Sequence, residues 1–149
     1  MMAPRPQTIL VVEDSDDDYL ATVRAFKKAG LLNPVQRCSS GDQALDYLFH
    51  RGEFADPGQA PRPGIVLLDL NLPGTDGREV LHMVKSDARL KSIPVIVLTT
   101  SIAPQDIERC YEYGANTYIH KPVNMEGFLR AIVQLKEYWF EVAVLPKEM

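Results

Sequence analysis

The sequence predicts an α/β domain in which a parallel sheet is doubly wound, with helices on both of its faces. Short apolar runs alternate along the chain with segments whose apolar residues recur at helical spacing. The runs are apolar without interruption, which suits strands that are buried on both faces of a parallel sheet. The clearest run, residues 65–68, is closed by Asp69 and by the turn residues Pro73 and Gly74.

The residues at the ends of the first strand and of the helix after it predict where these two elements begin and end. The β-rich run at residues 8–12 opens into two acids, and either Ser15 or Asp16 can cap a helix that ends at Ala29, before the stop residue Gly30. We expect the apolar residues at roughly helical spacing to line the buried face of this helix. They are Leu20, Val23, Ala25 and Phe26.

The later units repeat this alternation after one long interruption. Residues 52–64 carry three prolines among glycines and polar residues, so we expect a surface loop longer than most connections. The other predicted strands lie at residues 34–38, 94–99 and 117–119, and the other predicted helices at residues 41–49, 78–85, 104–113 and 124–139. This gives one domain at residues 8–137, with a leader at 1–7 and a C-terminal extension at 138–149.

The composition limits the function classes. A chain of 149 residues fits one domain with a sizeable core. A net charge of -4, a pI near 5.3 and the lack of a basic run argue against direct binding of nucleic acid or of an anionic membrane. The sequence has no signal-peptide pattern and no apolar segment near the roughly 20 residues that span a bilayer, so we expect a cytoplasmic protein.

Polar side chains stand at the ends of four predicted strands, and the carboxyl ends of parallel strands meet at one edge of a sheet. They are Glu13, Asp14, Asp69, Thr99 and Lys121. Three converging carboxylates repel one another unless a cation neutralises them, and hard oxygen ligands favour Mg²⁺. A lysine and a hydroxyl opposite that cation are the groups that neutralise and position a phosphoryl. The sequence therefore predicts transfer of a phosphoryl group to an aspartate carboxylate.

Each of these residues has a simpler explanation when it is taken alone. An Asp beside Pro and Gly often only begins a turn, a Lys beside Pro is usually exposed, and a Thr at a strand end usually caps. Their joint occurrence at successive strand ends favours the phosphoryl site over these explanations.

Four short motifs connect the chain to a known family. They are Val11-Val12-Glu13-Asp14, the run from Leu67 through Asp69-Leu70-Asn71-Leu72-Pro73-Gly74 to Gly77, the run from Pro94 to Thr99, and Tyr118-Ile119-His120-Lys121-Pro122. In order and spacing they resemble the receiver domain of two-component response regulators, over roughly residues 8–135. The resemblance implies a five-stranded, flavodoxin-like receiver fold with the strand order 2-1-3-4-5.

The resemblance also implies roles for the acids. Asp69 matches the phosphoacceptor. Asp14, Asp69 and the backbone carbonyl of Asn71 match the direct ligands of Mg²⁺, for which Mn²⁺ can substitute, and Glu13 matches a residue that acts through a bound water. Thr99 matches the hydroxyl that closes on the phosphoryl.

Three residues near the last strand complete the match. Lys121 matches the ammonium that neutralises the phosphoryl, and Tyr118 matches the aromatic residue whose rotamer follows Thr99. Half-buried packing is an equally good explanation of Tyr118 from the residues alone. Pro122 matches a proline whose preceding peptide bond is cis.

Two other classes of protein compete with a phosphoacceptor. A receiver-like interaction module without phosphoryl transfer would not need the intact acidic cluster and lysine. A flavin binder of the flavodoxin type would need a phosphate-binding loop after the first strand, where this chain has Glu13-Asp-Ser-Asp-Asp-Asp18. Mass measurement after exposure to acetyl phosphate and Mg²⁺ separates the three.

The partners follow from the resemblance to a subfamily. The long loop, the motif at residues 69–79 and the C-terminal extension are similar to those of small regulators that partner bacterial phytochromes. This implies a sensor histidine kinase, specifically a phytochrome, as phosphoryl donor, and a downstream protein target as receiver of the signal.

We also expect a homodimer through the face made by the helix after Thr99, the fifth strand and the last helix. The apolar residues 138–140 and 142–145 extend this face, and aromatic residues of this kind anchor interfaces. The alternative is that Trp139 and Phe140 fold back on their own domain.

Overall fold

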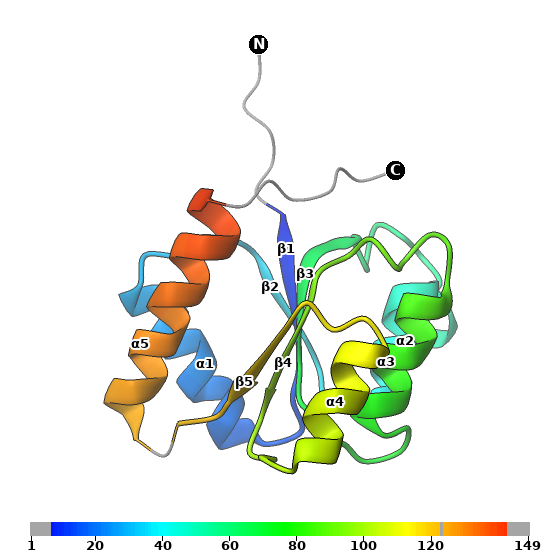
Figure 1. Cartoon of the computed structure of the whole chain (residues 1–149). Helices are drawn as coiled ribbons and strands as arrows, with labels where there is room; N and C mark the ends of the chain where they lie inside the picture. The colour runs from blue at the N-terminus through cyan, green and yellow to red at the C-terminus, as the bar shows by residue number, and fades with distance from the viewer. Residues whose placement is uncertain (1–6, 123, 143–149) are drawn as a thin grey trace.

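Five parallel strands form a single sheet in the order β2-β1-β3-β4-β5, as predicted. The computed structural model describes residues 7–122 and 124–142. Helices α1 and α5 cover one face of the sheet, and α2, α3 and α4 cover the other (Figure 1). No helix in the described residues has the length and apolar character needed to cross a membrane.

The elements follow the predicted alternation closely. In chain order they are β1 (Thr8–Val12), α1 (Asp16–Lys28), β2 (Val35–Cys38), α2 (Gly41–Phe49), η1 (Gly52–Phe54), β3 (Pro63–Leu68), α3 (Gly77–Ser86), β4 (Val95–Thr99), α4 (Pro104–Glu112), β5 (Thr117–His120), α5 (Met125–Lys136) and η2 (Glu137–Val142). The predicted long loop therefore contains a short 3-10 helix, and a π-helix continues α5 where the prediction had regular helix.

The sheet has an apolar layer on each side, which explains the continuous apolar runs of its strands. In β3, Ile65 and Leu67 belong to the core beneath α1 and α5, whereas Val66 and Leu68 belong to the core beneath α2, α3 and α4. All four side chains are at most 2% exposed. Successive strand side chains point to opposite faces, so a strand covered on both sides must be apolar at every position.

Helix α1 shows one error in the prediction. Of the two predicted cap candidates, Ser15 is the one that caps the helix, because its hydroxyl accepts a hydrogen bond from the Asp18 N–H at 3.2 Å. Ala25 and Phe26 are buried, but Leu20 is 50% exposed and Thr22 takes the inward position. Packing of α1 against the sheet and α5 settles which side faces the core, and a roughly helical spacing does not fix that side.

The predicted extension begins with Tyr138 and Trp139, and of these two Trp139 packs back on the domain. Trp139 packs against the core beneath α1 and α5. This is the outcome that the alternative to the dimer predicted for Trp139. Tyr138 contacts the Trp139 ring at 5.1 Å between centroids and remains 56% exposed. Residues 143–145, which the dimer prediction also used, lie outside the described residues.

Candidate functional site

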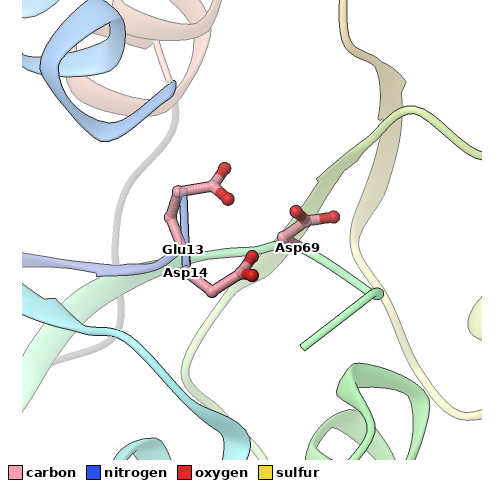
Figure 2. Close-up of side chains that lie close together, drawn as sticks. All are labelled: Glu13, Asp14 and Asp69. Carbon is pink, nitrogen blue, oxygen red and sulfur yellow. The ribbon is translucent and has the colours of Figure 1, made fainter. Parts of the chain in front are cut away.

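Three carboxylates meet at the carboxyl ends of β1 and β3, as predicted. The Glu13 N–H donates to the Cys38 carbonyl at 2.9 Å, and the Asp69 N–H donates to the Val12 carbonyl at 3.1 Å, so the sheet itself holds both acids. One carboxylate oxygen from each of Glu13, Asp14 and Asp69 lies within 4.8 Å of the others. Figure 2 shows the three side chains close together. Glu13 and Asp69 are buried, whereas Asp14 is exposed to solvent.

Lys121 places a buried ammonium in this cluster. Its N–H donates to the Thr99 carbonyl at 2.7 Å, which fixes the backbone at the end of β5. Its Nζ lies 2.5 Å from Glu13 Oε1, 3.1 Å from Asp69 Oδ2 and 3.0 Å from Asp18 Oδ2. An ammonium has three N–H donors, so three carboxylates use all of them.

The ionisation of the buried pair reflects two opposing effects. Burial raises the pKa of Glu13 to about 7, although the hydrogen bond and charge of Lys121 act in the opposite direction. Burial lowers the pKa of Lys121, but the hydrogen bonds that its ammonium donates to Glu13 and Asp18, together with the charges of Asp69 and Glu13, outweigh burial and leave that pKa raised. A single ammonium is therefore shared by three acids, and burial disfavours the charge of Glu13 among them.

These residues fit a hard divalent cation. The three acids supply only oxygen ligands, which Mg²⁺ and Mn²⁺ prefer, and the exposed Asp14 leaves the cluster open to solvent. A further positive charge would relieve repulsion that Lys121 alone does not balance.

The loop after β3 is clamped onto the start of α2. The Leu70 N–H donates to Asp69 Oδ1 at 2.7 Å, and Asn71 lies exposed in the next position. The Gly41 N–H donates to the Pro73 carbonyl at 3.3 Å. A Cβ on Gly41 would lie 1.8 Å from the Thr75 carbonyl oxygen, so only glycine permits this close approach. The clamp therefore holds the loop that carries Asn71 beside Asp69.

The predicted hydroxyl and aromatic residues lie in one connected group. Thr99 is fully buried, and its Oγ1 accepts a hydrogen bond from the Ser101 N–H at 3.4 Å. No hydrogen bond joins this hydroxyl to Asp69 in the part of the chain that the structure describes. Tyr118 is half-buried against the core, and its Oη donates to the Ser101 carbonyl at 2.9 Å. The packing explanation of Tyr118 is therefore confirmed, and its switch role stays a prediction.

A second polar group extends from this loop and was not predicted. Ser101 Oγ donates to Asp106 Oδ2 at 2.6 Å. Arg78 donates two hydrogen bonds to Asp106, from Nε at 2.6 Å and from Nη2 at 2.7 Å. Its Nη1 also donates to Asp76 Oδ2 at 3.0 Å. These hydrogen bonds lower the pKa of Asp106 to about 2, and the Arg78 guanidinium is the main cause. The group joins the first turns of α3 and α4.

One expectation about the backbone is wrong. The resemblance implied a cis bond before Pro122, but no cis peptide bond occurs in the described residues, which include Lys121 and Pro122. The trans form is the lower-energy one for a bond that precedes proline.

The fold and the site together define a doubly wound α/β domain with an acidic, lysine-containing site at the carboxyl edge of its sheet, beside the β1–β3 junction where the strand order reverses. The model of the response regulator receiver domain matches residues 9–133, and the chain belongs to this family of phosphoacceptor signalling proteins.

Three similar proteins illustrate the relationship. The probable methanogenesis regulatory protein FilR2 of Methanothrix harundinacea is 41% identical over 92% of this chain and 86% of its own length. Response regulator Rcp1 of Synechocystis sp. is 37% identical over 95% of this chain and 94% of its own, and its Mn²⁺-bound crystal structure gives a TM-score of 0.88. The phosphorylated cyanobacterial phytochrome response regulator RcpA gives a TM-score of 0.89, with 39% identity over 95% of this chain and 99% of that chain.

Proposed function

We propose that Asp69 accepts a phosphoryl group from a phosphohistidine of a sensor kinase in a two-component phosphorelay. The observation that carries this proposal is the buried ammonium of Lys121, which lies 3.1 Å from Asp69 Oδ2 at an open sheet edge. A carboxylate nucleophile needs a cation beside it when a phosphoryl group brings negative charge towards it.

The step exchanges one bond to phosphorus for another. A carboxylate oxygen of Asp69 forms a P–O bond as the P–N bond to the histidine breaks. The electron pair of that bond stays on the imidazole nitrogen, and the product on this chain is an acyl phosphate. Lys121 stays beside the phosphoryl oxygens and offsets their charge.

We propose Asp14, Asp69 and the backbone carbonyl of Asn71 as direct ligands of Mg²⁺, and Glu13 as a ligand through water. Bound there, the cation would supply charge stabilisation to the phosphoryl oxygens, and Mn²⁺ could replace it. Support comes from the cluster of three carboxylates within 4.8 Å and from the Mn²⁺-bound form of Rcp1.

Thr99 and Tyr118 would transmit the phosphorylation of Asp69 to the protein surface. In this proposal the Thr99 hydroxyl turns to a phosphoryl oxygen and releases the Ser101 N–H. Tyr118 then loses or changes its hydrogen bond to the Ser101 carbonyl, which now measures 2.9 Å. The signal would pass to a downstream protein target.

We propose a phytochrome as the sensor kinase. Rcp1 and RcpA are regulators of cyanobacterial origin, and RcpA is described as a phytochrome response regulator. A regulator of red light signalling from R. palustris gives a TM-score of 0.88 with 40% identity over 95% of this chain. Transfer would take place in the cytoplasm, the location for which the sequence argued.

The test is incorporation of phosphate, measured by intact mass. Wild-type protein with acetyl phosphate and Mg²⁺ should gain one phosphoryl group, and Asp69→Asn should gain none, because the amide keeps the shape and removes the nucleophile. Excess chelator should prevent the gain. If Asp69→Asn were labelled as fully as wild type, Asp69 would not be the phosphoacceptor. Full labelling in excess chelator would show that transfer does not require the metal ion. An interaction module or a flavin binder would stay unlabelled in every condition.

We also propose a homodimer through the α4–β5–α5 face. Ile102, Tyr111 and Tyr138 are 68%, 49% and 56% exposed on the domain, and exposed apolar side chains of this size mark contacts. Because Trp139 supports the core, truncation before it would damage the fold, and Tyr138→Asp is the cleaner variant.

Sedimentation at micromolar concentration tests the dimer. Tyr138→Asp should be monomeric, whereas Leu32→Asp, at a side chain that is 90% exposed in the segment after α1, should behave as wild type. A wild-type monomer in both phosphorylation states, or a dimer that survives Tyr138→Asp unchanged, would contradict this interface.

A further inference from the structure

Asp18 is the third carboxylate on Lys121, and neither the motifs nor the phosphoryl chemistry above gives it a role. It stands in the first turn of α1, where the Ser15 cap accepts its N–H at 3.2 Å and Thr22 donates to its carbonyl at 2.9 Å. Its Oδ2 lies 3.0 Å from Lys121 Nζ, across 103 positions of sequence. The contact is therefore built by the tertiary fold and held in place by the helix start.

The three partners of Lys121 differ in their contact with water. The side chains of Glu13 and Asp69 are 5% and 9% exposed, whereas that of Asp18 is 48% exposed. Glu13 also lies nearest to Nζ, at 2.5 Å, and accepts the Ser15 N–H at 3.3 Å. Glu13 and the backbone hydrogen bond from Lys121 to Thr99 therefore already hold Lys121 in place independently of Asp18. What Asp18 adds is a negative charge next to it.

We propose that Asp18 is a positioning residue that acts through Lys121 and moderates the positive charge that the ammonium offers to a phosphoryl group on Asp69. This inference rests on the proposed function. While Asp18 holds one N–H of Lys121, that donor is not available to a phosphoryl oxygen, and the carboxylate repels the phosphoryl from the α1 side. Removal of its charge should strengthen anion binding and weaken cation binding at the same site.

Asp18→Asn is the test variant, because it keeps the size of the side chain and removes its charge. Asp17→Asn is the matched control: Asp17 is exposed in the same turn, and the structure gives it no ion pair with Lys121. Beryllofluoride serves as the probe for a phosphoryl on Asp69, titrated at saturating Mg²⁺ and followed by ¹⁹F NMR. Mg²⁺ alone is titrated by calorimetry.

The two probes should move in opposite directions. Relative to Asp17→Asn, Asp18→Asn should bind beryllofluoride about two- to five-fold more tightly and Mg²⁺ about two- to five-fold more weakly, the range that a half-exposed ion pair supports. A purely structural role at the start of α1 would weaken both ligands, and that result would overturn the proposal. Equal constants for the two variants would overturn it as well.

The failure of the proposed function has a different signature. If Asp69→Asn bound beryllofluoride as tightly as wild type does, the assignment of Asp69 as phosphoacceptor would be wrong, regardless of the result for Asp18→Asn. If Asp69 still accepted phosphate while Asp18→Asn matched its control, only the role of Asp18 would be wrong.

Discussion

The ion pair between Arg78 and Asp106 should stabilise the domain in a strongly pH-dependent way. The two side chains form a bidentate pair at 2.6 and 2.7 Å, with exposed fractions of 21% and 16%, and Ser101 donates a further hydrogen bond to Asp106. Asp106→Asn keeps the shape of the side chain and removes its charge. It therefore isolates the electrostatic part of the link between α3, α4 and the loop after β4.

The magnitude follows from the pKa of Asp106, which is lowered from an ordinary 3.8 to about 2, mainly by Arg78. At 1.36 kcal/mol per pKa unit, the folded state gains about 2 kcal/mol from the ionised carboxylate. A carboxyl whose folded-state pKa is lowered stabilises the protein above its unfolded pKa. This contribution should be complete above about pH 5 and disappear as the pH falls from about 4 to about 2.

Urea unfolding at several pH values measures this effect. At pH 7, Asp106→Asn should be about 2 kcal/mol less stable than wild type, and the gap should close as the pH approaches about 2. Glu108→Gln, on the exposed side of the same helix, is the charge-matched control and should change stability by less than about 0.5 kcal/mol. A difference between Asp106→Asn and wild type that stays constant down to pH 2 would refute the electrostatic argument.

Three further predictions concern the site. Lys121→Met should destabilise the metal-free domain by about 3–5 kcal/mol, because it leaves buried carboxylates unpaired, and Mg²⁺ should restore more stability to it than to wild type; equal Mg²⁺ effects in urea unfolding would contradict this. Gly41→Ala should cost about 1–3 kcal/mol and weaken Mg²⁺ binding in calorimetry, because its Cβ would displace the Thr75 carbonyl; unchanged binding would mean that the clamp does not support the site. Tyr118→Phe should lose about 1 kcal/mol with its hydrogen bond to Ser101, yet accept phosphate from acetyl phosphate to the wild-type extent by mass; lost labelling would place Tyr118 in the transfer chemistry instead.

The sequence predicted the parts of the molecule that local pattern and parallel-sheet geometry determine. Continuous apolar runs marked strands buried on both faces, and Ser15 marked the start of α1, because a cap depends on residues only three positions apart. Since all parallel strands end at the same edge, Asp14, Asp69 and Lys121 could be brought together without knowledge of any side-chain contact.

The parts that escaped prediction depend on contacts between distant elements. Arg78 and Asp106 are 28 positions apart at the starts of two different helices, and no local pattern pairs an arginine with one acid among many. The contact between Asp18 and Lys121 escaped prediction for the same reason, since three acids follow Ser15 and only the fold shows which one reaches Lys121. The inward side of α1 and the return of Trp139 to the core are likewise settled by packing.

In the proposed function, Ser101 would carry a change at Asp69 to the α4–β5–α5 face without deforming the sheet. The Thr99 carbonyl accepts the Lys121 N–H just beyond the last residue of β5, and this bond ties the backbone at the end of β4 to β5, so in this proposal the Thr99 side chain turns while the backbone stays in place. When its hydroxyl turns away, the Ser101 N–H loses its acceptor, and an unpaired backbone donor costs free energy unless the loop moves to find another. Ser101 also holds Tyr118 by its carbonyl and Asp106 by its hydroxyl, so movement of this one residue alters both contacts together. The proposed switch would therefore need one side-chain rotation and would leave the hydrogen-bonded strands intact.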